Sequence, residues 1–203
     1  MTSAKLLTFS LDSNCIYAVE ESRPDAVFVK ELLHAHAAGK ASVALVAISG
    51  SERQRGGGHL ESFDEFKARV NALGFGGLEL LMPKAYLGIT YWNNAEWSDP
   101  GDTLERSIHE IVFPGIPFQW EDYCREKGLD PVADFNSDAA RKWKNAKCDV
   151  LALWSHAIRG RDVFVTRDTD FLAETKKRKL IALVGGHIET PESAVALLRK
   201  MTA

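Results

Sequence analysis

The chain has 203 residues, of which 45% are hydrophobic and 26% charged, and this suits one globular domain with a sizeable core. The formal net charge of −3 excludes a polybasic protein, so any nucleic acid would be held by local basic patches or through metal ions. The three cysteines are widely spaced and no apolar run reaches about 18 residues, so we expect a cytoplasmic protein with reduced thiols and no membrane span.

The first predicted elements are a strand and a helix. Residues 5–11 are mostly apolar and predict a strand that ends at Asp12. Ser22 and Asp25 have the spacing of a capping box, which predicts the start of a helix that ends at Gly39.

The middle of the chain contains a second strand, a helix and an irregular region. Residues 42–48 are almost continuously apolar, as in a strand that is buried on both faces. Residues 62–73 place their apolar side chains on one helical face. Residues 84–131 are rich in aromatic residues and proline, and we interpret them as an insertion with a helix around 103–111. Its aromatic side chains are expected to form a core of their own, with stacking on nucleic-acid bases as the alternative.

The last third of the chain returns to a regular alternation. Residues 134–158 predict a long helix, and the apolar triplet before Thr166 predicts a buried strand. A short helix is expected over residues 172–179, a final strand over 180–184, and a last helix that starts near Pro191.

Strands that alternate with helices, without a hairpin signal, predict an α/β fold. We expect a three-layer αβα arrangement with a central, mostly parallel sheet. The whole chain (1–203) would form this single domain, with residues 84–131 inserted into it.

Acidic side chains follow three of the predicted strands, and another lies in the long helix: Asp12, Glu52, Asp149, and Asp168 with Asp170. Because ligands bind at the carboxyl ends of the strands in parallel α/β sheets, acids at that edge suggest a cation site. A set of oxygen ligands without His or Cys favours Mg²⁺ or Mn²⁺ over zinc. The structural alternative is that Asp168 and Asp170 form a turn and cap the next helix.

These motifs resemble the PIN domain, a family of metal-dependent nucleases. The similar segments are Leu11-Asp-Ser-Asn14, the Asp149-Val-Leu-Ala152 helix, Val165-Thr-Arg-Asp168-Thr-Asp-Phe171, and Thr190-Pro-Glu192 after a strand. Two features depart from the family pattern. Glu52 is followed by arginines and three glycines instead of a continuous helix, and the chain carries the additional residues 84–131.

The resemblance implies a role for each site residue. Asp12, Asp149 and Asp168 would be the principal ligands of Mg²⁺ or Mn²⁺, and Glu52 and Asp170 would be additional acids of the catalytic set. Asn14 and Thr166 would orient water, ligand or phosphate. Arg167 would either form an ion pair that keeps the acids ionised or contact a phosphate directly.

The expected function is that of a metal-dependent nuclease, foremost an endoribonuclease acting on single-stranded RNA. Because many small members of the family are toxins of toxin–antitoxin pairs, an antitoxin protein is one expected partner, and a homodimer is another. The alternatives are a DNA-directed or structure-specific nuclease and a non-catalytic RNA-binding or protein-interaction module. A phosphohydrolase with an aspartyl nucleophile is disfavoured, because Asn14 stands where its Asp-x-Asp motif needs a second acid.

Overall fold

A computed structural model describes residues 6–51, 62–91, 94–97 and 103–202. The described residues contain one sheet of five strands in the order β3-β2-β1-β4-β5, and all four pairings are parallel. The strands are β1 (Thr8–Leu11), β2 (Ser42–Val46), β3 (Glu79–Leu81), β4 (Val163–Val165) and β5 (His187–Glu189). The predicted α/β class with a parallel sheet is therefore confirmed.

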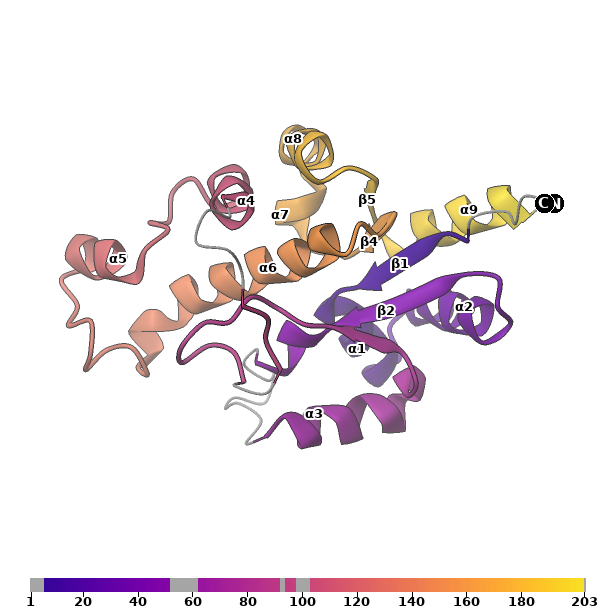
Figure 1. Cartoon of the computed structure of the whole chain (residues 1–203), viewed down its shortest axis with the longest axis horizontal. Coiled ribbons are helices and arrows are strands. Elements are labelled where there is room, and N and C mark those ends of the chain that lie inside the picture. Colours follow the sequence, from indigo (N-terminus) through magenta and orange to yellow (C-terminus); the bar gives the residue numbers. More distant parts are fainter. Residues whose placement is uncertain (1–5, 52–61, 92–93, 98–102, 203) are drawn as a thin grey trace.

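Helices cover both faces of this sheet, as the three-layer prediction requires (Figure 1). One face is packed against α1 (Ser13–Glu20), α2 (Ala26–Ala37), α3 (Phe63–Val70) and α9 (Pro191–Thr202). The opposite face is packed against α4 (Leu104–Val112), α6 (Arg141–Ile158), α7 (Thr169–Leu172) and α8 (Glu174–Val184).

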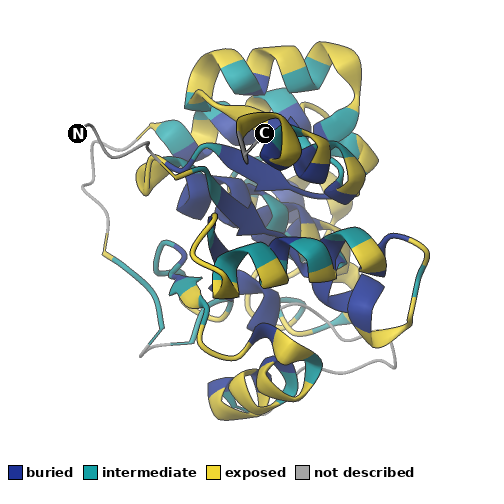
Figure 2. Ribbon diagram, turned by 90° about the vertical axis from the view of Figure 1, so that its right-hand side faces the viewer, coloured by how far each residue is buried: buried dark blue, intermediate teal, exposed yellow. Residues whose placement is uncertain are grey.

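Alternating side chains of the strands divide the interior into two apolar cores. Phe9 and Leu11 of β1 lie in the core beneath α1 and α2, whereas Phe164 of β4 lies in the core beneath α6 and α8. Figure 2 shows the buried sheet between helices whose outer faces are exposed. This alternation follows from the two-residue period of a strand.

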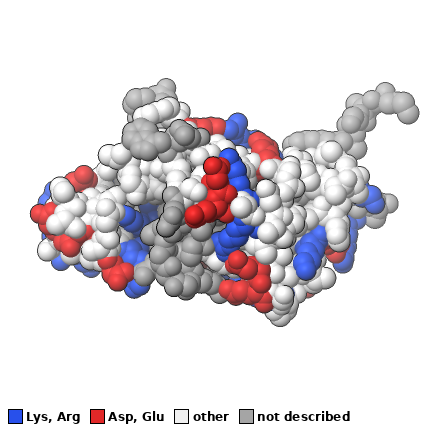
Figure 3. Space-filling view, turned by 90° about the horizontal axis from the view of Figure 1, so that it is seen from below, with Lys and Arg blue, Asp and Glu red and all other residues white. Residues whose placement is uncertain are grey.

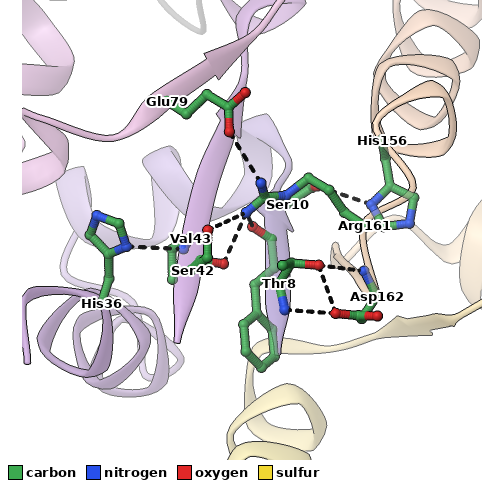
Figure 4. Close-up of polar contacts among 10 residues, drawn as sticks. Thr8, Ser10, His36, Ser42, Val43, Glu79, His156, Arg161 and Asp162 are labelled. Atoms are coloured by element: carbon green, nitrogen blue, oxygen red, sulfur yellow. Dashed lines mark hydrogen bonds and ion pairs between the residues drawn. The ribbon is translucent and has the colours of Figure 1, made fainter. Parts of the chain in front are cut away.

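The buried side chain of Arg161 connects several strands at the amino edge of the sheet (Figure 4). Its Nη2 donates hydrogen bonds to the carbonyl oxygens of Phe9 (3.0 Å) and Ser42 (2.9 Å), and its Nη1 lies 3.2 Å from Glu79 Oε2. Arg161 lies two positions before β4. Its guanidinium therefore connects the chain before β4 with β1, β2 and β3.

Asp162 and His156 add polar contacts at the same edge (Figure 4). The backbone N–H and the hydroxyl of Thr8 donate to Asp162 Oδ2 at 3.0 and 2.8 Å. His156 of α6 is hydrogen-bonded through Nδ1 to the Ser10 hydroxyl at 2.9 Å. These side chains are all bonded within the fold, so we assign them to the structure of the sheet.

The described part of the aromatic region expected to be an insertion contains two helices, α4 and α5 (Trp120–Lys127). The helix predicted around residues 103–111 is thus present. Trp120 packs on Trp143 of α6 with ring centroids 5.4 Å apart, and Phe135 lies against both rings. Trp120 is thus part of a small core, as predicted, but residues outside 84–131 share that core, and Trp97 is 85% exposed. Trp92 lies outside the described residues.

A buried ion pair joins α4 to α6 near this small core. Lys147 Nζ lies 2.7 Å from Glu105 Oε1, and both side chains are 1% exposed. The ammonium also contacts the Tyr86 hydroxyl (3.3 Å) and lies 3.9 Å from the centre of the Phe118 ring. Lys84 contacts the other carboxylate oxygen of Glu105 at 3.1 Å. Burial lowers the pKa of Lys147, an effect that the charge of Glu105 opposes.

Several predicted boundaries differ from the structure. The strand predicted over residues 180–184 is wrong, because these residues are the end of α8 and the strand is β5. The helix predicted over 172–179 is split between α7 and α8. The capping box is also wrong: Ser22 lies in a turn with φ of 52°, and α2 begins at Ala26 without a side-chain cap. Helix α1 was not predicted.

Candidate functional site

The buried carboxylate of Asp12 is the centre of a hydrogen-bond network at the carboxyl ends of β1 and β4. Its Oδ1 accepts a bond from the Ser13 N–H at 2.8 Å and so caps α1. Its Oδ2 accepts from Asn14 Nδ2 at 2.9 Å and from the Thr166 hydroxyl at 2.7 Å. The backbone N–H of Asp12 donates to the carbonyl of Val165 at 3.0 Å. The structure therefore brings Asp12, Asn14 and Thr166 together.

Asp168 and Asp170 extend this network from β4 into α7. The Asp168 N–H donates to the Thr166 hydroxyl oxygen at 3.0 Å, and Asp168 Oδ1 caps α7 by accepting from the Asp170 N–H at 2.8 Å. Lys176 of α8 contacts Asp170 Oδ1 at 2.5 Å. The predicted capping role of Asp168 is confirmed, and within the described residues its Oδ2 accepts no hydrogen bond.

Burial disfavours the ionised forms of the Asp12 and Asp168 carboxyl groups. Burial raises the pKa of Asp12, and the hydrogen bonds from Thr166, Asn14 and Ser13 only partly oppose this. Burial also raises the pKa of Asp168, and the negative charges of Asp12 and Asp170 raise it further. A positive ion at this edge would relieve the repulsion among the carboxylates.

Arg167 forms its ion pair with a carboxylate that was not predicted for the site. Its Nη1 lies 3.1 Å from Oδ2 of Asp25, which directly precedes α2. The Asp25 side chain is 7% exposed, and neither of its oxygens accepts a hydrogen bond from the described residues. The sequence shows Asp25 only as a helix-start residue, and no local signal links it to Arg167.

The buried thiol of Cys15 is influenced both by Asp25 and by the acidic network. We use this name for Asp12, Asn14, Thr166, Asp168 and Asp170. Cys15 is buried in α1, and its Sγ lies 3.6 Å from the carbonyl oxygen of Val165. Burial raises the pKa of this thiol, the charges of Asp12 and Asp25 raise it further, and Arg167 opposes them. Both carboxylates and the guanidinium are thus close enough to Cys15 for their charges to act on it.

The remaining two predicted acids are Asp149 and Glu52. Asp149 is half-buried on α6, on the opposite face of the sheet from α1. Glu52 lies outside the described residues. Across residues 6–51, 62–91, 94–97 and 103–202, no group of three or more His, Cys, Asp or Glu side chains is arranged to hold a metal ion.

The chain was compared with family models, curated proteins and solved structures, and none of the three comparisons found a match. The similarity to the PIN domain therefore stays a prediction. Among the described helices, none combines the length and apolar character needed to cross a bilayer.

Proposed function

We propose that the protein is a metal-dependent nuclease that hydrolyses phosphodiester bonds, foremost in single-stranded RNA. The observation that supports this is the network in which Asp12, Thr166 and Asp168 meet at the carboxyl edge of the sheet. Asn14 adds an amide that is bonded to the same carboxylate. Burial disfavours the charged forms of Asp12 and Asp168, and a bound cation would stabilise these charged forms.

The side-chain atoms that could bind a cation at this edge are carboxylate, hydroxyl and amide oxygens. Such oxygen ligands fit a hard divalent cation. Asp12 and Asp168 would hold Mg²⁺ or Mn²⁺, with Asp149 and Glu52 as the further acids that the sequence motifs suggest. When bound, such an ion neutralises phosphate charge and lowers the pKa of a bound water. The hydrogen bonds of Thr166 and Asn14 would keep the Asp12 carboxylate in a fixed orientation.

The test is cleavage of labelled single-stranded RNA and DNA in Mg²⁺ or Mn²⁺. We expect cleavage that EDTA and the Asp168→Asn variant both abolish. Asn can still cap α7, so this variant removes the charge without removing the cap. The matched control is Asp64→Asn, which removes an exposed carboxylate from α3. Cleavage that survives both EDTA and Asp168→Asn would contradict the proposal.

The alternative is a non-catalytic module that binds RNA or a protein partner. Two ion pairs favour it, because Lys176 neutralises Asp170 and Arg167 is held by Asp25 instead of by the acidic network. A module of this kind would bind RNA in EDTA with the same affinity as in Mg²⁺. Binding without cleavage of either nucleic acid would favour this function over hydrolysis.

A further inference from the structure

Arg167 carries a guanidinium that is only partly used by the fold. It lies between Thr166 and Asp168, two members of the acidic network, and its side chain is 51% exposed. Its one ion pair within the described residues is the contact with Asp25 through Nη1. A guanidinium has five N–H donors in a planar fork, so most of them have no partner among the described residues.

Asp25 explains why this exposed side chain has a defined position. A buried carboxylate without hydrogen bonds strongly requires a cation, and Arg167 is the cation that the structure supplies. Asp25 belongs to the segment before α2 and Arg167 to the segment after β4, so the pair joins two parts of the chain that are distant in sequence. The Asp25 carboxylate is covered by protein, whereas the Arg167 side chain is half exposed and belongs to the segment that carries Thr166 and Asp168.

We propose that Arg167 contacts a backbone phosphate of a bound nucleic acid next to the acidic network, and that Asp25 is the positioning residue that holds Arg167 for this contact. The inference rests on the nucleic-acid substrate proposed above. The proposed contact is a charge-assisted hydrogen bond from the planar guanidinium to a phosphate oxygen. The arginine is already oriented before the nucleic acid binds. The acids alone would repel a phosphate, and Arg167 provides a positive group within the same short segment.

The experiment measures binding of a short labelled single-stranded RNA in EDTA, so that cleavage plays no part. Dissociation constants are determined over a range of salt concentrations for the wild type, Arg167→Gln, Asp25→Asn and the double variant. The matched controls are Arg125→Gln and Asp122→Asn, which alter the charges of an exposed ion pair within α5 in the same way. Thermal melts and titration of the active fraction show whether each variant is folded.

We expect Arg167→Gln to weaken binding about tenfold, as for the loss of one charge-assisted contact, and to reduce the salt dependence by about 0.7 in slope. Asp25→Asn separates positioning from charge. Removal of a negative charge by itself would tighten the binding of RNA, as we expect for Asp122→Asn. Loss of the positioning carboxylate instead predicts weaker binding and a smaller salt slope. The double variant should bind no more weakly than Arg167→Gln.

Two results would overturn this inference: an Arg167→Gln variant that binds as Arg125→Gln does, or an Asp25→Asn variant that binds more tightly than the wild type. A wild type that binds no RNA in EDTA would overturn it as well. The nuclease proposal is tested separately by cleavage in Mg²⁺. Retained phosphate binding without cleavage would contradict only the nuclease, and cleavage with unchanged binding in the variants would contradict only the role of Arg167.

Discussion

The side chain of His156 lies between α6 and β1, where it is 1% exposed and hydrogen-bonded to Ser10. Burial lowers its pKa from 6.5 to about 4, and the positive charge of Arg161 acts in the same direction. At neutral pH the imidazole is therefore uncharged. Between pH 6.5 and 4 the unfolded chain binds a proton at this position that the folded protein excludes.

This difference predicts that stability falls as the solution is acidified. The contribution of neutral His156 is complete above pH 6.5 and is lost as the pH decreases toward 4, for a total of about 3 kcal/mol. We expect His156→Asn to remove this part of the pH dependence, because Asn keeps a polar group near Ser10 but does not titrate. Urea unfolding at several pH values measures the slope.

The matched control for this experiment is His34→Asn on the exposed surface of α2. It should leave the pH dependence of the unfolding free energy close to that of the wild type. A His156→Asn variant with the same pH slope as the wild type would show that the buried imidazole does not control acid stability.

The residues of the candidate site were predictable only where they belong to one short motif. Asp12 and Asn14, like Thr166 and Asp168, are two positions apart in the sequence, and parallel pairing of β1 with β4 brings the two motifs together. Asp25 could not be found in this way, because its ion pair depends on how a turn between two helices packs. Contacts of that kind leave no periodic signal in the sequence.

At the scale of secondary structure, the pairing of α4 with α6 depends on the buried charges of Glu105 and Lys147. Replacement of Lys147 by Met leaves the Glu105 carboxylate buried, with Lys84 as its remaining ion-pair partner among the described residues. We expect a loss of about 3 kcal/mol from the free energy of unfolding, because a buried charge without its partner is strongly unfavourable. Urea unfolding at neutral pH gives this value.

The double variant Lys147→Met with Glu105→Leu should recover most of the lost stability, since an apolar pair of similar volume needs no compensating charge. The exposed side chain of Lys142 on the same helix provides the control, and Lys142→Met should change stability by less than about 0.5 kcal/mol. The coupling of Lys147 with Glu105 would be contradicted if the double variant lost as much unfolding free energy as the two single variants together.

The elements themselves were predicted where their pattern was long or their strand was buried on both faces. Residues 180–184 were assigned wrongly because a short apolar run fits a strand and a partly buried helix equally. In α8, Leu180 is buried whereas Leu183 is 38% exposed, which only the folded structure reveals. The actual strand β5 has one fully buried residue, Ile188, between two polar ones, and therefore gives little hydrophobic signal.

At the scale of the whole molecule, acidic and basic side chains are interspersed on the face shown in Figure 3. The formal net charge is only −3, so a long-range field is not expected to dominate ligand binding. Binding of a cation would instead be a local property of the acidic network. Its effect on the entire protein is a rise in melting temperature, because an ion that binds only the folded state stabilises it by mass action.

We therefore expect millimolar Mg²⁺ or Mn²⁺ to raise the melting temperature of the wild type by about 3 °C, corresponding to about 1 kcal/mol for a chain of this size. The Asp168→Asn variant should not respond to metal. In EDTA near neutral pH this variant should melt above the wild type, because the raised pKa of Asp168 means that its ionised form destabilises the fold. That advantage should vanish below the ordinary pKa of 3.8.

Differential scanning calorimetry in EDTA and in metal measures both effects, with Asp64→Asn as the control for loss of an exposed carboxylate. Equal metal responses of the wild type and Asp168→Asn would place any bound cation elsewhere. A lower melting temperature of Asp168→Asn in EDTA would show that its cap, and not its charge, governs stability.

The position of β1 in the sheet has a consequence for synthesis of the chain. β1 pairs with β2 soon after both have been made, but its other neighbour, β4, begins only at Val163. Until then one edge of a central strand has no partner, and such edges promote aggregation of incomplete chains. Thr166 and Asp168 follow β4 directly, so a nascent chain cannot complete the acidic network before both neighbours of β1 have been made. A chain that ended before β4 would lack the network and would leave one edge of β1 unpaired.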